Sequence, residues 1–141
     1  MSLVSTKDDF NIIDGEINIL SESLFKLGQN SFESALKNSV SKETSEIVSK
    51  LVLENDKKEV ISSLKEILKK AEFVELVVAV ELSSKFTTKI ASLVKKSISQ
   101  NAVLDIKVDK NVIAGAIFSF RGKYLDLSIN KKLEEILKNY V

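Results

Sequence analysis

Large apolar side chains recur at intervals of three and four residues over the first part of the chain. This spacing places them on one face of a helix, and it predicts a helix from Phe10 to Leu27. Gly28 is expected to end that helix, because glycine is the residue most often found just after a helix C-terminus. The residues of the stripe are Phe10, Ile13, Ile17, Leu20, Leu24 and Leu27.

Three further helices are predicted before residue 72. A short one is expected at residues 32–37, and Ser41 and Asp56 are of the residue types that cap the N-terminus of a helix. Glu59 follows Asp56 after three residues, which is typical of a capping box. The positions expected to be buried in the helix after Ser41 are Ile47, Val48 and Leu51.

The hydrophobic period changes at about residue 72, where strands enter the pattern. Residues 73–80 form a short run rich in β-branched side chains, which is typical of a strand. Ser83 or Ser84 is then expected to cap a helix, and residues 102–108 follow the period of two that predicts a second strand. The buried face of the helix between these strands is expected to contain Phe86, Ile90, Leu93 and Val94.

The last part of the chain is predicted to form a hairpin and a final helix. A third strand is expected at about residues 113–120 and a return strand at residues 123–127, joined by a turn at Arg121-Gly122. Ser128 is expected to cap the last helix. The order of elements in this half is therefore β-α-β-β-β-α.

Together these patterns predict an α+β protein with two domains. Residues 1–72 form an N-terminal helical bundle of about four helices, and residues 73–141 form a small β-α-β-β-β-α domain. The first domain holds ten Lys against thirteen acidic residues, a net charge of −3, whereas the second holds ten Lys and Arg121 against seven acidic residues, a net charge of +4. The positive charge of the second domain favours an acidic partner.

The residue types that are missing narrow the function. The chain has no His and no Cys, which rules out metal sites built on those residues, Ser-His and Cys-His catalytic pairs, and disulfides. Asp109 is interpreted as closing a turn through its side chain, and Asp126 as fixing the junction between a strand and the final helix, rather than as an acid–base pair. We therefore predict a binding or structural protein, not an enzyme, with no catalytic residues, no cofactor and no metal.

Location and nucleic-acid binding are also constrained by the sequence. The N-terminus lacks the basic and apolar regions of a signal peptide. The longest nearly apolar run, residues 73–80, is interrupted by Glu75 and is too short to span a bilayer. These features predict a cytoplasmic location. Arg121 is the only arginine, which argues against a nucleic-acid partner.

The segment from Val108 to Ile129 resembles the C-terminal signature of the delta subunit of F-type ATP synthases, the family of the oligomycin-sensitivity-conferring protein. The resemblance covers about residues 50–141, whereas residues 1–50 match only as generic helices, so the helical bundle is shorter than the one usual in the family. Ala114 stands where the family has the first glycine of a pair. The residues that match the family motif in order and spacing are Asp109, Ile113, Gly115, Asp126 and Ser128.

The resemblance implies a stator subunit of a proton-translocating F-type ATP synthase. Such a subunit links the catalytic head to the peripheral stalk, so that rotation is coupled to ATP synthesis, and it binds no nucleotide itself. The implied partners are the N-terminal helix of an alpha subunit and the b subunit of the stalk. The implied location is the cytoplasmic face of the bacterial cell membrane, which the subunit contacts only indirectly through the complex.

Two apolar surfaces are the candidate partner-binding sites. The stripe of the first helix is either the core face of the bundle or a surface that docks a partner helix, and the two roles are compatible if the bundle is incomplete without its partner. For the alpha subunit the candidate residues are Phe10, Ile13, Ile17, Leu20 and Leu24. For the stalk they are Leu133, Ile136, Leu137 and Tyr140 in the final helix.

Two alternatives to the delta-subunit hypothesis stay open at this point. One is the E-type peripheral-stalk subunit of a V/A-type ATPase, which is expected to begin with a long charged helix, whereas Gly15 and Gly28 interrupt this N-terminus. The other is a small nucleic-acid-binding module, suggested by the order of strands and the basic second half. Only 6% of the residues are aromatic, so few side chains are available to stack on nucleic-acid bases, which argues against this second alternative.

Overall fold

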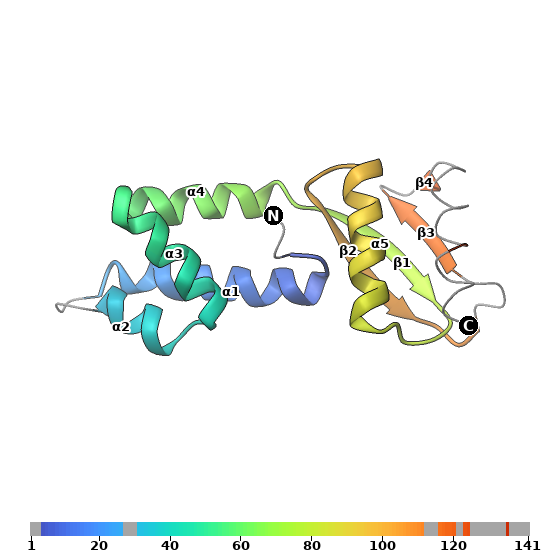
Figure 1. Cartoon of the computed structure of the whole chain (residues 1–141), viewed down its shortest axis with the longest axis horizontal. Helices are drawn as coiled ribbons and strands as arrows, with labels where there is room; N and C mark the ends of the chain where they lie inside the picture. The colour runs from blue at the N-terminus through green and yellow to red at the C-terminus, as the bar shows by residue number, and fades with distance from the viewer. Residues whose placement is uncertain (1–3, 27–30, 112–115, 121–122, 125–134, 136–141) are drawn as a thin grey trace. The chain divides into compact units, whose positions relative to one another are not determined.

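The computed structural model describes residues 4–26, 31–111, 116–120, 123–124 and 135 (Figure 1). Within these residues the chain contains five helices and one four-stranded sheet. The predicted α+β class is therefore confirmed. The predicted turn at Arg121-Gly122 and the final helix after Ser128 lie outside the described residues.

The chain forms two compact units, each of which is described separately. One is the helical unit, Asn11–Lys70, and the other is the α/β unit, which combines Ala71–Val141 with Met1–Phe10. The first ten residues therefore belong to the α/β unit. The boundary between the two units after Phe10 lies inside the first helix, which spans Lys7–Ser23. The division into domains of residues 1–72 and 73–141 remains a prediction.

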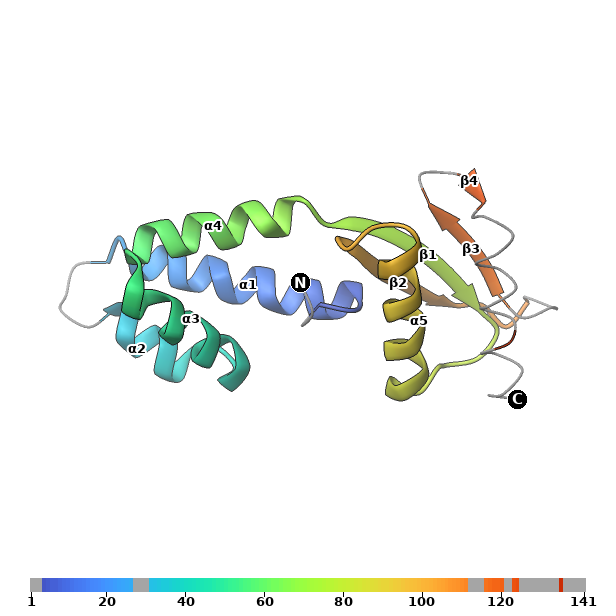
Figure 2. The same ribbon diagram turned by 45° about the horizontal axis from the view of Figure 1, so that its top comes forward.

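Four helices precede the first strand. They are α1 (Lys7–Ser23), α2 (Ser31–Asn38), α3 (Lys42–Glu54) and α4 (Lys57–Lys69). In both views α2 and α3 lie side by side (Figures 1 and 2). Ser41 caps α3 by accepting a hydrogen bond from the Thr44 amide, and Asp56 caps α4 by accepting one from the Lys58 amide. The buried apolar residues of the helical unit are Ile17, Leu20, Phe32, Ala35, Leu36, Val48, Val60, Ile61 and Leu68.

The first helix ends earlier than its apolar stripe predicts. It stops at Ser23, where the hydroxyl donates to the carbonyl oxygen of Leu20 at 2.6 Å. The amides of Leu24 and Phe25 then donate to carbonyl oxygens three residues back instead of four. A serine side chain that takes a backbone acceptor in this way competes with the helical bond pattern. Leu24 consequently lies in a turn.

The buried face of α3 also differs from the prediction. Val48 is buried as expected, but Ile47 and Leu51 are exposed, and the other buried position is Thr44. Thr44 lies four residues before Val48, so the two share one face, and Ile47 and Leu51 lie at its flank. The expectation for Ile47 and Leu51 was therefore wrong. An apolar side chain is buried only where a neighbouring helix covers it, and the residue type alone does not show which positions are covered.

The α/β unit is built on a central strand, β1. The strands lie in the order β2-β1-β3-β4; β1 pairs in parallel with β2 and antiparallel with β3, and the helix α5 packs against β2. A parallel pair needs a crossover connection, and α5 supplies it (Figure 1). The elements are β1 (Glu72–Val78), α5 (Ser84–Ser97), β2 (Ala102–Val108), β3 (Ala116–Phe120) and β4 (Lys123–Tyr124).

The core between α5 and the sheet follows the period of two along β1. Ser83 caps α5 by accepting from the Phe86 amide, which settles the choice between the two serines. Ala91 belongs to the buried face, whereas Phe86 and Leu93 are only half-buried. The buried cluster consists of Val74, Leu76, Val78, Ile90, Ala91, Val94, Ala102 and Leu104.

A segment before α1 extends the sheet beyond β2. Thr6 forms a parallel bridge with Leu104, and the carbonyl oxygen of Ser5 accepts from the Leu104 amide at 2.9 Å. Val4 is buried, with 2% of its surface exposed. The chain then enters α1 through a reciprocal cap between Thr6 and Asp9, in which each side chain accepts from the amide of the other.

Candidate partner-binding surfaces

The stripe predicted to bind the alpha subunit is placed largely in the interior of the helical unit. Ile17 and Leu20 are buried, and Leu20 has 0% of its surface exposed. Ile13 and Leu24 are half-buried. The stripe therefore forms core, which is one of the two roles that its pattern allows. Contact of these residues with a partner remains a prediction.

Phe10 lies apart from the rest of the stripe, because it belongs to the α/β unit. Its ring meets the ring of Phe73 edge to face, with centroids 5.1 Å apart and an interplanar angle of 83°. Lys7, one turn earlier, forms an ion pair with Asp105 at 3.7 Å. These contacts attach the first turn of α1 to the sheet.

The helical unit carries a second set of large apolar side chains on its surface. Ile12 and Ile19 lie seven residues apart on α1, and Ile47 and Leu51 lie four residues apart on α3, so each pair shares one face of its helix. Ile12 is 59% exposed. The sequence pattern does not single out Ile12 and Ile19, because the larger apolar stripe dominates α1, and it places Ile47 and Leu51 in the interior instead of at the surface. The other members are Phe25, Leu53 and Ile67.

Polar contacts fix the helices that carry these exposed side chains. The carboxylate of Glu16 accepts from the backbone amide of Ser41 at 3.0 Å and from its hydroxyl at 3.2 Å. The amine of Lys65 donates to the hydroxyl of Ser21 at 2.8 Å. These hydrogen bonds join α1 to the start of α3 and to α4. They hold the backbones of the helices that carry the exposed apolar side chains in fixed positions.

A third contact within the helical unit joins α2 to α4. Lys57 forms an ion pair with Glu33, and its amine lies 5.2 Å from the centre of the Phe32 ring. The hydrogen bond from Lys57 lowers the pKa of Glu33. Both charged groups are exposed, so this contact orients side chains and adds little to the stability of the unit.

The α/β unit presents a strongly basic helix. The sequence of α5 contains Lys85, Lys89, Lys95 and Lys96 and no acidic residue. Lys95 is half-buried and donates to the carbonyl oxygen of Val4 at 2.6 Å. Burial lowers the pKa of Lys95. The other three lysines are exposed.

Of the family-motif residues, Asp109 alone lies within the described part of the chain. Its amide donates to the carbonyl oxygen of Val78 at 2.8 Å, and its carboxylate accepts from the amide of Asn111 at 3.0 Å. Such a bond two residues along the chain is the Asx-turn that was expected. The remaining motif residues, which are Ile113, Gly115, Asp126 and Ser128, lie outside the described residues.

The candidate stalk contacts cannot be placed in the same way. Leu133, Ile136, Leu137 and Tyr140 all lie outside the residues that the structure describes. Across the described ranges, no three acidic side chains converge closely enough to hold a metal ion. The same ranges contain no helix long and apolar enough to cross a membrane.

Comparison with known proteins identifies the family. Residues 25–139 match the family model described as ATP synthase delta (OSCP) subunit. The match covers most of the chain, and the chain belongs to this family. Of the hypotheses that the sequence left open, the delta-subunit resemblance is confirmed.

Curated relatives agree with this assignment over shorter stretches. ATP synthase subunit delta of Thermosipho africanus is 30% identical over 95 residues, which are 62% of this chain and 52% of the relative. The same subunit of Thermosipho melanesiensis is 35% identical over 65 residues, 46% of this chain and 36% of the relative. The one from Fervidobacterium nodosum is 33% identical over 61 residues, 43% and 34% respectively. The matches thus span about a third to a half of the relatives' own length.

Proposed function

We propose that the chain is a non-catalytic stator subunit of a proton-translocating F-type ATP synthase. The observation that carries the proposal is the family match over residues 25–139. In this role the subunit holds the catalytic head against the peripheral stalk while the rotor turns. The task is mechanical, and it calls for contact surfaces rather than for reactive groups.

We assign the contact with the N-terminal helix of the alpha subunit to the helical unit. Ile17 and Leu20 are buried within the chain, so in this proposal they support the exposed surface, and direct contact between them and the partner would require the helices to open. Ile12 and Ile19 on α1 and the exposed pair on α3 offer apolar area that a partner helix would bury. Burial of such anchors is what sustains an interface under load.

The contact with the b subunit of the stalk is assigned to the α/β unit. The proposed residues in the final helix remain Leu133, Ile136, Leu137 and Tyr140. Through the stalk and the head, the subunit is held at the cytoplasmic face of the bacterial membrane without entering it. This arrangement gives the protein two partners, one for each unit.

The contact with the head can be tested on the exposed face of α1. The double variant Ile12→Asp, Ile19→Asp removes two exposed apolar side chains and leaves the buried stripe intact. The matched control is Asn11→Asp, Asn18→Asp, which adds the same charge at the same spacing on exposed positions of the same helix. The readout is retention on the purified catalytic head and on a peptide of the alpha-subunit N-terminus.

The wild-type chain and the control variant Asn11→Asp, Asn18→Asp are expected to bind the head and the peptide. The Ile variant is expected to bind at least about tenfold more weakly, because two anchors of about 1–2 kcal/mol each are lost. A wild-type chain that binds neither the head nor the peptide would overturn the proposed function. Equal binding by both variants would move the contact away from this face of α1.

A further inference from the structure

Charge on α5 is arranged differently from charge on the other helices of the described residues. Each of the helices α1 to α4 has at least one acidic residue in its first turn, whereas α5 has none there. The sequence of α5 contains four lysines and no acidic residue. A helix of a single charge sign presents an uninterrupted positive potential to a partner.

Three of these lysines form one exposed row. Lys85, Lys89 and Lys96 lie at positions i, i+4 and i+11, with Ser92 between them, and all four are exposed. The row spans about 16 Å at the rise of an α-helix. The opposite face of α5 is buried in the core of the unit through Ile90 and Val94. Among the described residues, none of the three lysines has an ion-pair partner.

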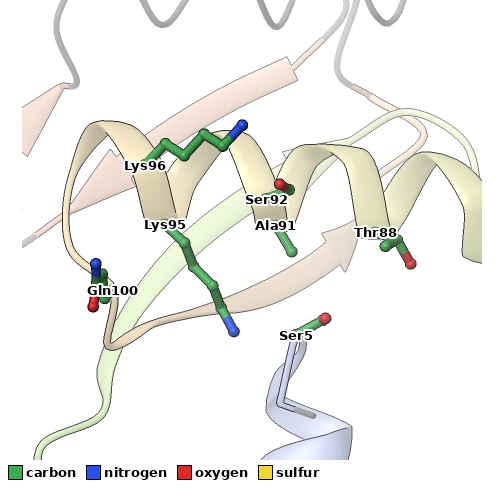
Figure 3. Close-up of a pocket in the computed structure, with 7 residues that line it drawn as sticks. All are labelled: Ser5, Thr88, Ala91, Ser92, Lys95, Lys96 and Gln100. Carbon is green, nitrogen blue, oxygen red and sulfur yellow. The ribbon is translucent and has the colours of Figure 1, made fainter. Parts of the chain in front are cut away.

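A cleft runs along one side of this row. It has a volume of about 540 Å³, and the described residues that line it contribute hydroxyl, amide and amine groups together with Ala91. Figure 3 shows Lys95 reaching from α5 toward the segment that carries Ser5, while Lys96 lies along the outer side of the helix. The polar groups that line the cleft belong to Ser5, Thr88, Ser92, Lys95, Lys96 and Gln100.

We infer that the exposed lysine row of α5 and the cleft beside it form the docking site for an acidic helical segment of a protein partner. Carboxylates on a helix at spacings of four and seven residues match the spacing of the three lysines, and the hydroxyl-lined cleft accepts one carboxylate as a hydrogen-bond acceptor. The inference rests on the proposed function in one respect, since it takes the stalk b subunit as the source of that segment.

The surroundings of the row favour a protein helix over a membrane surface. A helix that binds a membrane inserts bulky apolar side chains beside its basic face, and the apolar face of α5 is already buried against the sheet. Nucleic acid is disfavoured because the row contains lysine and no arginine. Phe86, the aromatic residue of α5, lies under the amine of Lys89 at 5.6 Å from its ring centre.

The test compares two charge-reversal variants of the full chain for binding to the soluble part of the b subunit encoded with it. The first is Lys85→Glu, Lys89→Glu, Lys96→Glu. The matched control makes the same net change on exposed lysines of the helical unit, and its substitutions are Lys37→Glu, Lys42→Glu and Lys50→Glu. Far-UV circular dichroism and urea unfolding establish that both variants are folded.

The α5 variant is expected to bind the b subunit at least about tenfold more weakly than wild type at about 0.1 M salt, and to lose most of the salt dependence of binding. The control is expected to stay within about twofold of wild type. Equal binding by the two variants would overturn the inference and leave the proposed function standing. A wild-type chain that binds the head and fails to bind the b subunit would instead overturn the stalk assignment.

A charge-exchange experiment tests the inference independently. Carboxylates of the b subunit that cross-link to the three lysines are changed to lysine, and this change is expected to restore binding to the α5 variant. Binding to vesicles of phosphatidylcholine and phosphatidylglycerol tests whether the lysine row binds a membrane surface instead. If the lysine row governs binding to these vesicles while binding to the b subunit is unaffected, the inference is wrong.

Discussion

The amine of Lys95 donates a hydrogen bond to the carbonyl oxygen of Val4 at 2.6 Å, and so joins two residues 91 positions apart. Val4 is buried and its neighbour Ser5 accepts a bond from Leu104 in β2. The segment is thus held on two sides, by an edge of the sheet and by α5. Closing a contact over this length of chain costs conformational entropy, which the bond and the burial of Val4 offset.

Lys95→Met is expected to lower the free energy of unfolding by about 1–2 kcal/mol, because the Val4 carbonyl loses its donor while most of the side-chain packing is kept. Lys96→Met is the control, since Lys96 is exposed; it is expected to change stability by less than about 0.5 kcal/mol. Urea unfolding followed by circular dichroism measures both. Equal effects of the two substitutions would show that the bond to Val4 does not stabilise the segment.

The pH dependence of stability provides a second test of Lys95. Burial lowers its pKa below the ordinary 10.5, and the charge of Asp9 opposes that shift. The unfolded chain therefore keeps the proton over a range in which the folded chain has released it, so stability from this group rises with pH. The difference in unfolding free energy between wild type and Lys95→Met is therefore expected to grow as the pH rises toward the ordinary lysine pKa of 10.5. A constant or shrinking difference would contradict this sign.

Local signals in the sequence were sufficient for the beginnings of several elements. Ser41, Asp56 and Ser83 cap the helices that follow them, because a short oxygen-bearing side chain satisfies free amides at a helix start whatever lies further away. The run at residues 73–80 became β1 for an equally local reason, the fit of β-branched side chains to a pleated surface.

Features that depend on distant parts of the chain were not predictable. The bridge between Thr6 and Leu104 joins two distant segments, and no sequence pattern in either segment indicates that they pair. Ile47 was expected inside and is exposed, because its position depends on where the neighbouring helices lie. The capping pair Thr6 and Asp9 did have a local signal, an acid three residues after a threonine, which the stronger apolar stripe obscured.

The contact between Glu16 and Ser41 leads to a prediction for the helical unit. Glu16→Ala removes two hydrogen bonds and a negative charge near the N-terminus of α3, so it is expected to cost about 1–2 kcal/mol. Glu16→Gln keeps one acceptor and is expected to cost about half as much. Glu22→Ala, at an exposed position of the same helix, is the control. Thermal unfolding measures the stability of all three variants. An equal loss of stability in Glu22→Ala and Glu16→Ala would show that the contact between Glu16 and Ser41 does not stabilise the unit.

Gly15 occupies an exposed position within α1, and a methyl group added there would meet no atom within 4 Å. Gly15→Ala is therefore expected to stabilise the protein by about 0.5–1 kcal/mol, since alanine restricts the unfolded chain and fits a helix without strain. A rise in the midpoint of thermal unfolding would show this. A fall would mean that the glycine has a steric role that the surroundings do not reveal.

The two apolar faces of α1 are expected to separate stability from partner binding. Leu20 is fully buried, so Leu20→Ala should cost about 2–5 kcal/mol through lost burial and the cavity that remains. Ile12 is 59% exposed, so Ile12→Ala should change stability by less than about 0.5 kcal/mol. Urea unfolding measures these values, and titration with an alpha-subunit N-terminal peptide measures binding.

The same pair of variants also tests the division of roles within the helix. A folded Ile12→Ala chain is expected to bind the peptide several-fold more weakly, by the loss of about 1 kcal/mol at a contact residue. Leu20→Ala is expected to weaken binding only in proportion to the fraction of unfolded protein, because Leu20 supports the surface from inside. If folded Leu20→Ala lost affinity while Ile12→Ala kept it, the buried stripe itself would have to open and receive the partner helix.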